Sequence, residues 1–238
     1  MNRAPPGEVF AGADGCPAGW VMVSAGRDGE RLSLRAVRVV PDFAALLAAT
    51  AECVAVAVDT PIGLAEDGNR QADRLARERL RPKRSSSVFP TPARLLLSAR
   101  SYSEANALSW SALGKGLPAQ AFGIIGKIKD ADKCMTPQLQ ARIVESHPEL
   151  CFWALAGDEP LAHSKHTEEG LEERLRLLES VYGPRVRELK PPRGAARDDV
   201  YDALVLAWTA SHVAAGTAVH LPSEPQRDAR GLRMEMVY

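Results

Sequence analysis

Acidic side chains stand at the ends of several apolar stretches of this chain. Asp14 and Asp59 each follow an apolar run and precede turn-forming residues, and Glu145 ends a third run. Asp199 and Asp202 are three residues apart in an alanine-rich stretch, which places them on one face of a predicted helix. Because the carboxyl ends of neighbouring strands converge on one edge of a sheet, we expect these carboxylates to meet.

Carboxylates gathered in an apolar scaffold repel one another unless cations neutralise them. Their hard oxygen ligands suit Mg²⁺ or Mn²⁺. Two such ions can activate a water molecule and stabilise the leaving oxygen of a phosphoryl transfer. The pattern therefore predicts a two-ion site held by Asp14, Asp59, Asp199 and Asp202, with Glu145 as a further catalytic candidate in the same cleft. A purely structural role is the alternative for each, since aspartate is common in turns and at helix starts.

A basic stretch supplies the second candidate site. Residues 70–84 carry seven Lys or Arg residues against two acidic ones, followed by a run of three serines. We predict that phosphate groups contact this stretch and one lysine further along the chain, through Arg70, Arg74, Arg77, Arg84 and Lys127. A solvated charged helix is the alternative. No aromatic residues are interleaved with these cations, so we expect no platform for base stacking.

Histidine and cysteine offer weaker candidates. His147 follows the predicted strand that ends at Glu145, where an imidazole could orient water or carry a proton, although a structural histidine is the favoured alternative. A cysteine nucleophile, Cys16 or Cys134 paired with His147, has no supporting local motif. The four cysteines are far apart and form no C-x-x-C pair, which favours reduced thiols in the cytoplasm over disulfides or structural zinc.

The composition is that of an ordinary globular protein. The 238 residues are 45% hydrophobic and 25% charged, and 30 basic residues balance 30 acidic ones. A formal net charge of zero argues against a protein that binds nucleic acid over its whole surface, but it permits a local basic patch. No apolar run is long enough to span a membrane, so we expect a cytoplasmic protein without a membrane partner.

Hydrophobic periodicity predicts the elements that position these residues. The first 60 residues are predicted to form three strands, a helix and a fourth strand, and the fourth strand at residues 53–58 is buried on both faces. About residues 66–140 form a mostly helical insertion within a single domain, residues 1–238. A strand at residues 141–145 and three helices follow, and residues 219–222 and 234–238 are predicted to be peripheral extended pieces.

Three segments together resemble one protein family, the domain of unknown function 429. They are residues 12–20 (GADGCPAGW), 58–64 (VDTPIGL) and 198–204 (DDVYDAL). Weaker matches extend the resemblance over nearly the whole chain, at residues 70–77, 86–90, 114–117, 120, 127–128 and 145–149. Members of the family are described as predicted nucleases with an RNase H-like fold. The last segment also resembles the two-aspartate helix of Holliday-junction resolvases, which share that fold.

The resemblance implies both a fold and a reaction. The fold would be α/β, a mixed five-stranded RNase H-like sheet flanked by helices, with a helical insertion after the fourth strand. Asp14 and Asp59 would be the carboxylates of the first and fourth strands, and Asp199 and Asp202 the helix pair, whereas the fold does not require Glu145. The implied activity is metal-dependent cleavage of nucleic acid or another phosphodiester, leaving a 5′-phosphate.

Two other functions remain open at this point. One is a binding module of the same fold that holds nucleic acid or a phosphate ligand without catalysis. The other is an ATP-binding protein of the actin and sugar-kinase type, because Asp14, Gly15 and Asp59 also resemble the phosphate-loop acids of that related fold. Such proteins need two copies of the core, and this chain shows no internal repeat.

Overall fold

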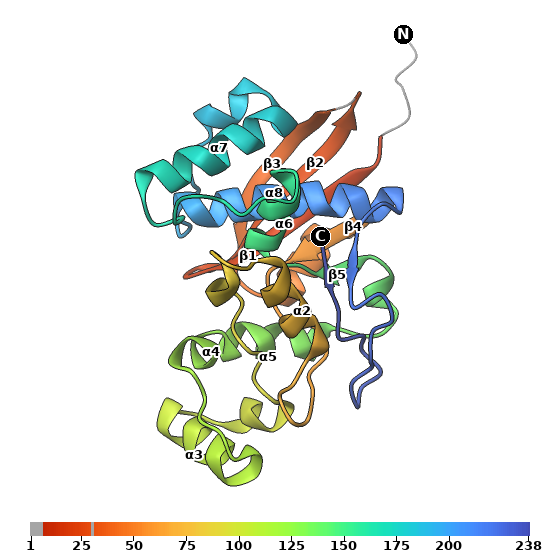
Figure 1. Ribbon diagram of the computed structural model, residues 1–238. Coiled ribbons are helices and arrows are strands. Elements are labelled where there is room, and N and C mark those ends of the chain that lie inside the picture. The colour runs from red at the N-terminus through yellow and green to blue at the C-terminus, as the bar shows by residue number, and fades with distance from the viewer. Residues whose placement is uncertain (1–6, 30) are drawn as a thin grey trace.

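A central five-stranded sheet organises the protein in the computed structural model, which describes residues 7–29 and 31–238 (Figure 1). Strands β1 (Val9–Cys16), β2 (Gly19–Asp28) and β3 (Arg31–Val40) form an antiparallel meander. Strands β4 (Ala55–Val58) and β5 (Ile143–Glu145) run parallel to β1, and the order is β3-β2-β1-β4-β5. This order and these directions confirm the predicted RNase H-like fold.

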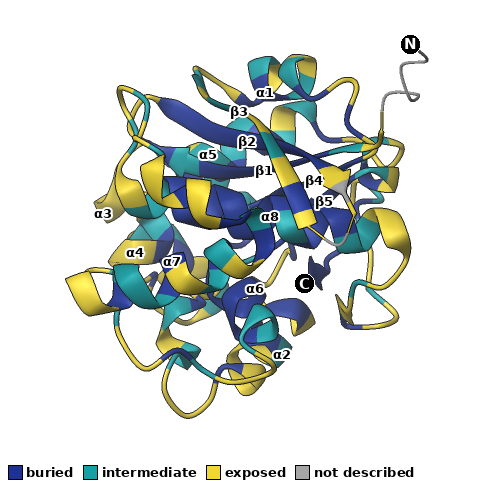
Figure 2. Ribbon diagram, turned by 90° about the horizontal axis from the view of Figure 1, so that it is seen from above, coloured by how far each residue is buried: buried dark blue, intermediate teal, exposed yellow. Residues whose placement is uncertain are grey.

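Helices cover both faces of the sheet. One face packs against α8 (Arg197–Ala215), α6 (Pro148–Leu155) and α7 (Glu168–Tyr182). The other face packs against α1 (Phe43–Ala49) and α5 (Ile125–Cys134). Viewed from above, β1 and most of α8 are coloured as buried (Figure 2). Because the central strands are covered on both sides, β4 consists only of small and β-branched apolar residues, as predicted.

The contact between β1 and α8 is unusually close and depends on Gly12. A Cβ atom at this position would lie 2.2 Å from both Ala203 O and Ala207 N of the helix backbone. Only a glycine at this position therefore allows α8 to pack so closely against β1. The crossing fixes where the first turn of α8 lies relative to the end of β1.

Replacing Gly12 by Ala should destabilise the fold, because the added methyl group would clash with backbone atoms of α8. These atoms cannot move aside as a flexible side chain could. We expect a loss of at least about 2 kcal/mol, which corresponds to a fall in Tm of about 5 °C in calorimetry. The matched control is Gly126→Ala in α5, where a new Cβ would meet nothing within 4 Å. That variant should be neutral or slightly more stable, and an equal loss in both variants would refute the role of Gly12.

The segment between β4 and β5 contains α2 (Gln71–Arg79), α3 (Tyr102–Leu113), α4 (Ala119–Gly123) and α5. Helices α3 and α4 contribute to a small apolar core of their own, in the lower part of Figure 1. Short 3₁₀ helices lie at η1 (Ser85–Ser87), η2 (Arg94–Ser98), η3 (Leu139–Ala141) and η4 (Pro184–Glu188). Because α5 also packs on the sheet, we propose that residues 66–140 are an insertion within one domain.

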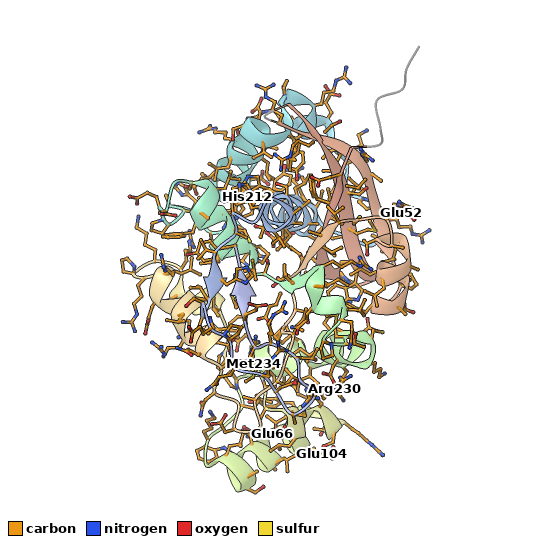
Figure 3. The ribbon with its side chains drawn as sticks, turned by 90° about the vertical axis from the view of Figure 1, so that its right-hand side faces the viewer. Glu52, Glu66, Glu104, His212, Arg230 and Met234 are labelled. Atoms are coloured by element: carbon orange, nitrogen blue, oxygen red, sulfur yellow. The ribbon has the colours of Figure 1, made fainter. Side chains whose placement is uncertain are left out.

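The C-terminal segment is more central than its sequence predicts. Strands β6 (His220–Leu221) and β7 (Met236–Val237) form a two-stranded sheet, and residues 236–238 are buried. Ser146 Oγ, next to β5, donates a hydrogen bond of 2.5 Å to Val237 O. Arg230, labelled in Figure 3, forms an ion pair of 2.8 Å with Asp132 of α5. The prediction of peripheral extended pieces was therefore wrong for residues 234–238.

No helix in the described part of the chain is long and apolar enough to cross a membrane.

Candidate functional site

The register of the sheet brings Asp14 and Asp59 together. Ala13 of β1 pairs with Val58 of β4, so the two aspartates follow at matching positions of parallel strands. The amide of Asp59 continues this pairing with a hydrogen bond of 2.9 Å to Ala13 O. Side chains alternate between the faces of a sheet, and Ala13 and Val58 face α1 and α5. Both aspartates therefore point to the face that α8 covers.

Asp14 lies inside strand β1 rather than in the predicted turn. The strand continues to Cys16, because its hairpin with β2 turns only at Pro17 and Ala18. Asp14 is opposite Val21 in this ladder and only 7% exposed. The turn reading of the Asp-Gly pair was thus wrong, and the aspartate is held by strand pairing.

Helix α8 adds two more carboxylates to this edge of the sheet. Because α8 crosses β1 at Gly12, its first turns lie beside Asp14. Asp202 is 1% exposed, whereas Asp199 is half-buried and accepts a hydrogen bond of 2.8 Å from Ala196 N at the start of the helix. The structure thus brings together the two strand aspartates and the helix pair that the sequence singled out.

The electrostatics reflect this proximity. Burial, and then the negative charges of Asp59 and Asp202, raise the pKa of Asp14 well above its ordinary range. Burial also raises the pKa of Asp202, to about 6, although Lys165 opposes the shift. Carboxylates that repel one another in a buried setting bind a cation favourably.

Lys165 is a member of this site that the sequence did not indicate. It lies between α6 and α7, and its Nζ is 2.6 Å from Asp202 Oδ2. Burial alone would lower its pKa, but the charge and hydrogen bond of Asp202, and then Asp14, raise it. The lysine sits in a polar loop without any motif, so nothing in the sequence could have linked it to the aspartates. It is the positive partner of the acidic cluster.

A cavity of about 530 Å³ opens over these residues. Its acidic lining includes Asp14, Asp59 and Asp199. Basic and imidazole side chains line it as well: Arg84, Lys127, His147, Lys165 and His166. The remainder of the lining comes largely from residues 86–91 and 145–149. The lining thus combines carboxylates, which suit metal ions, with cations, which suit a phosphate ester.

Glu145 borders the same cavity, but its carboxylate is already engaged. It is 3% exposed, and its Oε2 accepts hydrogen bonds of 2.6 Å from both Arg70 Nη2 and Ile62 N. Glu145 is paired with Val58, one position before Asp59, and therefore points to the opposite face of the sheet. The structure does not place its carboxylate with the aspartates, and it forms a buried ion pair with Arg70 instead.

The predicted phosphate-binding residues separate into two groups. Arg70 is fully buried against Glu145, and the carboxylates of Glu145 and Asp73 raise its pKa although burial opposes this. Arg74 pairs with Glu78 on the exposed side of α2. Neither arginine lines the cavity, because Arg70 is held in a buried ion pair and Arg74 faces solvent. The structure thus places both away from the positions where phosphate contacts were predicted.

The other three cations lie at or beside the cavity. Arg77 donates a hydrogen bond of 2.7 Å to Val88 O and so holds the loop that lines it. Arg84 and Lys127 are themselves in the lining, and Lys127 Nζ lies 4.9 Å from the centre of the Trp20 ring. Lys127 and Arg84 are therefore the two predicted cations that are placed to meet a ligand.

His147 is oriented by a single hydrogen bond. Its Nε2 lies 3.2 Å from Ser87 O, and since a carbonyl only accepts, Nε2 donates this hydrogen bond. Nδ1 is buried and has no partner within the described residues. Neither Cys16 nor Cys134 lines the cavity, and burial raises the pKa of the Cys134 thiol. The cysteine-nucleophile hypothesis is therefore not supported by this arrangement.

The donor chemistry of the site fits a hard divalent cation. The four aspartates offer only oxygen ligands, which Mg²⁺ and Mn²⁺ prefer. Within residues 7–29 and 31–238, however, no three His, Cys, Asp or Glu side chains are already gathered as ligands of one ion. Lys165 pairs with Asp202 at this place. An ion could be held here if this ammonium group withdraws.

Of the comparisons with known proteins, the one with family models confirms the resemblance. A solved structure, "T. thermophilus RuvC in complex with Holliday junction substrate", is 17% identical, with a TM-score of 0.41, over 88% of this chain and 97% of that one. Comparison with curated proteins found no match. The model of the family "Protein of unknown function (DUF429)" matches residues 12–227, nearly the full length. The chain belongs to this family.

Proposed function

We propose that this protein is a divalent-metal-dependent nuclease, which hydrolyses phosphodiester bonds and leaves a 5′-phosphate. The observation that carries the proposal is the parallel register that sets Asp14 beside Asp59 on the face covered by α8. With Asp199 and Asp202 from α8, four carboxylates stand against one lysine at this edge of the sheet. The excess negative charge favours binding of a divalent cation.

Each residue then has a task that its surroundings explain. Asp14, Asp59 and Asp202 would hold Mg²⁺ or Mn²⁺, and Asp199, fixed by Ala196 N, would complete the ligand set. When bound, such ions activate water and stabilise the leaving oxygen. Lys127 and Arg84, which also line the cavity, would neutralise the phosphate of the substrate.

His147 would be a positioning residue that holds the Ser87 loop against the cavity. Its Nε2 donates to Ser87 O, and its Nδ1 is buried without a partner in the described part of the chain. The ring orientation is thus set by the loop that closes the cavity rather than by the substrate.

A second function is favoured by one observation, the ion pair of 2.6 Å between Lys165 and Asp202. In a binding module without catalysis, this lysine would be a permanent counter-ion of the aspartates. In the nuclease, it must leave when metal binds. The two proposals therefore differ in how the protein responds to metal.

Millimolar Mn²⁺ or Mg²⁺ should raise the Tm of the wild-type protein, because the carboxylates are gathered only in the folded state. At a hundred times Kd we expect a rise of about 5–10 °C. Lys165→Met should lower the metal-free Tm and enlarge the rise with metal, since the competing ammonium is gone. The matched control is Lys83→Met, an exposed lysine away from the cavity. A Tm unmoved by either metal in every variant would support the binding module.

Activity itself is tested by incubating the protein with single-stranded, duplex and branched nucleic acids, with Mn²⁺ and with a chelator. The nuclease proposal expects metal-dependent products that carry a 5′-phosphate, detected by their susceptibility to a 5′-phosphate-specific ligation. Absence of cleavage on every substrate, together with an unmoved Tm, would overturn it.

A further inference from the structure

The cavity is small, and Asp14 in its lining is buried. Its volume is about 530 Å³, in the range of pockets that enclose one small ligand. Asp14, on which the proposed metal site is centred, is only 7% exposed. A DNA duplex cannot enter a cavity of this volume, because its major groove alone is about 12 Å wide. A phosphate must therefore enter the cavity to reach Asp14, and the space suffices for a group of nucleotide size.

Hydrogen bonds join the segments that surround the cavity. Arg84 Nε donates to Leu161 O at 3.2 Å, which ties residues 84–91 to the loop that carries Lys165. His147 Nε2 lies 3.2 Å from Ser87 O, which ties the same segment to residues 145–149. Three parts of the lining are thus linked to one another. Because these segments are held together, the cavity fits a strand end better than a strand that continues on both sides of the reacting phosphate.

An exposed aromatic side chain also lines the cavity. Phe89 is 38% exposed, although large aromatic residues are normally covered. Arg77 holds its neighbour Val88 through the carbonyl oxygen. A nucleic-acid base stacks on such a ring regardless of its sequence. Phe89 lies outside residues 70–84, where no stacking surface was expected, and offers such a surface in the cavity.

A buried hydroxyl provides a separate indication of a ligand. Thr60 directly follows Asp59, lines the cavity and is 3% exposed. Its Oγ1 has no hydrogen-bond partner in the described part of the chain. A buried polar group without a partner costs about 1–3 kcal/mol, so such groups call for an explanation. A phosphate oxygen in the cavity would accept its proton.

We infer that the cavity binds a single nucleotide unit: a base on Phe89, and its phosphate between the aspartates and the Lys127, Arg84 and Thr60 side chains. This unit is the terminal nucleotide of a single strand or a free phosphoester of the same size. The inference rests on the proposed function and narrows it to substrates with an accessible end.

A linear single-stranded oligonucleotide and its covalently closed circle distinguish this inference from general nuclease activity. The two have the same sequence and the same bonds, and they differ only in having ends. With Mn²⁺, we expect the linear form to be shortened from one end and the circle to react at least a hundredfold more slowly. A duplex and a four-way junction with closed ends should also be resistant, and a dinucleotide should be cleaved. A circle cut as fast as the linear strand would overturn the inference while leaving the nuclease proposal intact.

Binding of nucleoside 5′-monophosphates supplies a readout that does not need catalysis. In the presence of Mn²⁺ they should raise the Tm, by about 3–5 °C at ten times Kd, more than inorganic phosphate or the bare nucleoside does. Phe89→Ala should weaken this binding about tenfold. Trp110→Ala is the matched control, because Trp110 is 59% exposed on α3 and does not line the cavity. Its nucleotide binding should equal that of the wild type.

The two readouts separate the possible failures. Nucleotide binding without cleavage of any substrate would overturn the nuclease but support the pocket assignment. Cleavage of circles or closed junctions, without nucleotide binding, would support the nuclease but overturn the pocket assignment. Equal loss of binding in Phe89→Ala and Trp110→Ala would show that the ring at position 89 is not the stacking surface.

Discussion

Asp59→Asn should reduce phosphodiester hydrolysis by about a thousandfold or more while the protein stays folded. The amide keeps the size of the side chain but removes the charge that would hold the metal ion. Losing one such interaction in the transition state costs several kcal/mol, hence three or more orders of magnitude in rate. Asp14→Asn should have the same effect, because the two residues occupy matching positions on neighbouring strands. The measurement is the initial rate of cleavage with Mn²⁺ on the substrate that the wild type cuts best.

The thermal stability of these variants provides the internal control. Burial and neighbouring negative charges raise the pKa of Asp14, so the neutral Asn should leave the metal-free protein as stable or more stable. Asp198→Asn is the matched substitution, because Asp198 belongs to the same helix turn as Asp199 but does not line the cavity. It should retain wild-type activity. Equal cleavage by the wild type and both site variants would reveal a contaminating nuclease and contradict the assignment.

Arg70→Met should destabilise the protein by about 3–5 kcal/mol, because it leaves the carboxylate of Glu145 buried without its partner. The side chain of Arg70 is completely buried and also donates to Thr91 Oγ1 at 2.9 Å. For a chain of this size the loss corresponds to a fall in Tm of about 10 °C. Urea unfolding followed by circular dichroism measures the change in the free energy of unfolding.

Two further variants identify the cause of this loss. Arg70→Met combined with Glu145→Gln should recover part of the stability, since the unpaired charge is then removed as well. Arg74→Met should cost less than about 1 kcal/mol, because the ion pair of Arg74 with Glu78 is exposed to solvent. If Arg70→Met left stability unchanged and weakened nucleotide binding, its predicted phosphate contact would be reinstated.

The sequence was informative where the chemistry follows from regular structure. Asp14 and Asp59 follow apolar runs that become neighbouring parallel strands, so their meeting depends only on topology. Asp199 and Asp202 share a face because the helix repeat is regular. Glu145 shows the limit of this reasoning. A strand end can be predicted, but a shift of one position moves a side chain to the other face of the sheet.

The remaining site residues come from loops and could not be predicted. Lys165 reaches Asp202 from a connection between two helices, and Phe89 is positioned by hydrogen bonds from Arg77 and His147 to its loop. These contacts join segments far apart in the sequence, and neither residue belongs to a periodic pattern. Arg70 was predicted to contact phosphate, but it directly precedes α2 and pairs with Glu145 in the interior.

The close crossing at Gly12 also has a consequence for how the chain acquires its site. Strands β1 to β3 are consecutive and joined by tight turns, so they can pair soon after leaving the ribosome. Helix α8, which crosses β1 at Gly12 and carries Asp199 and Asp202, is made much later. Closing so long a loop comes late in folding. A nascent chain therefore exposes Asp14 and Asp59 without their partners, and the cleavage proposed here would begin only after α8 has been made and packed on β1.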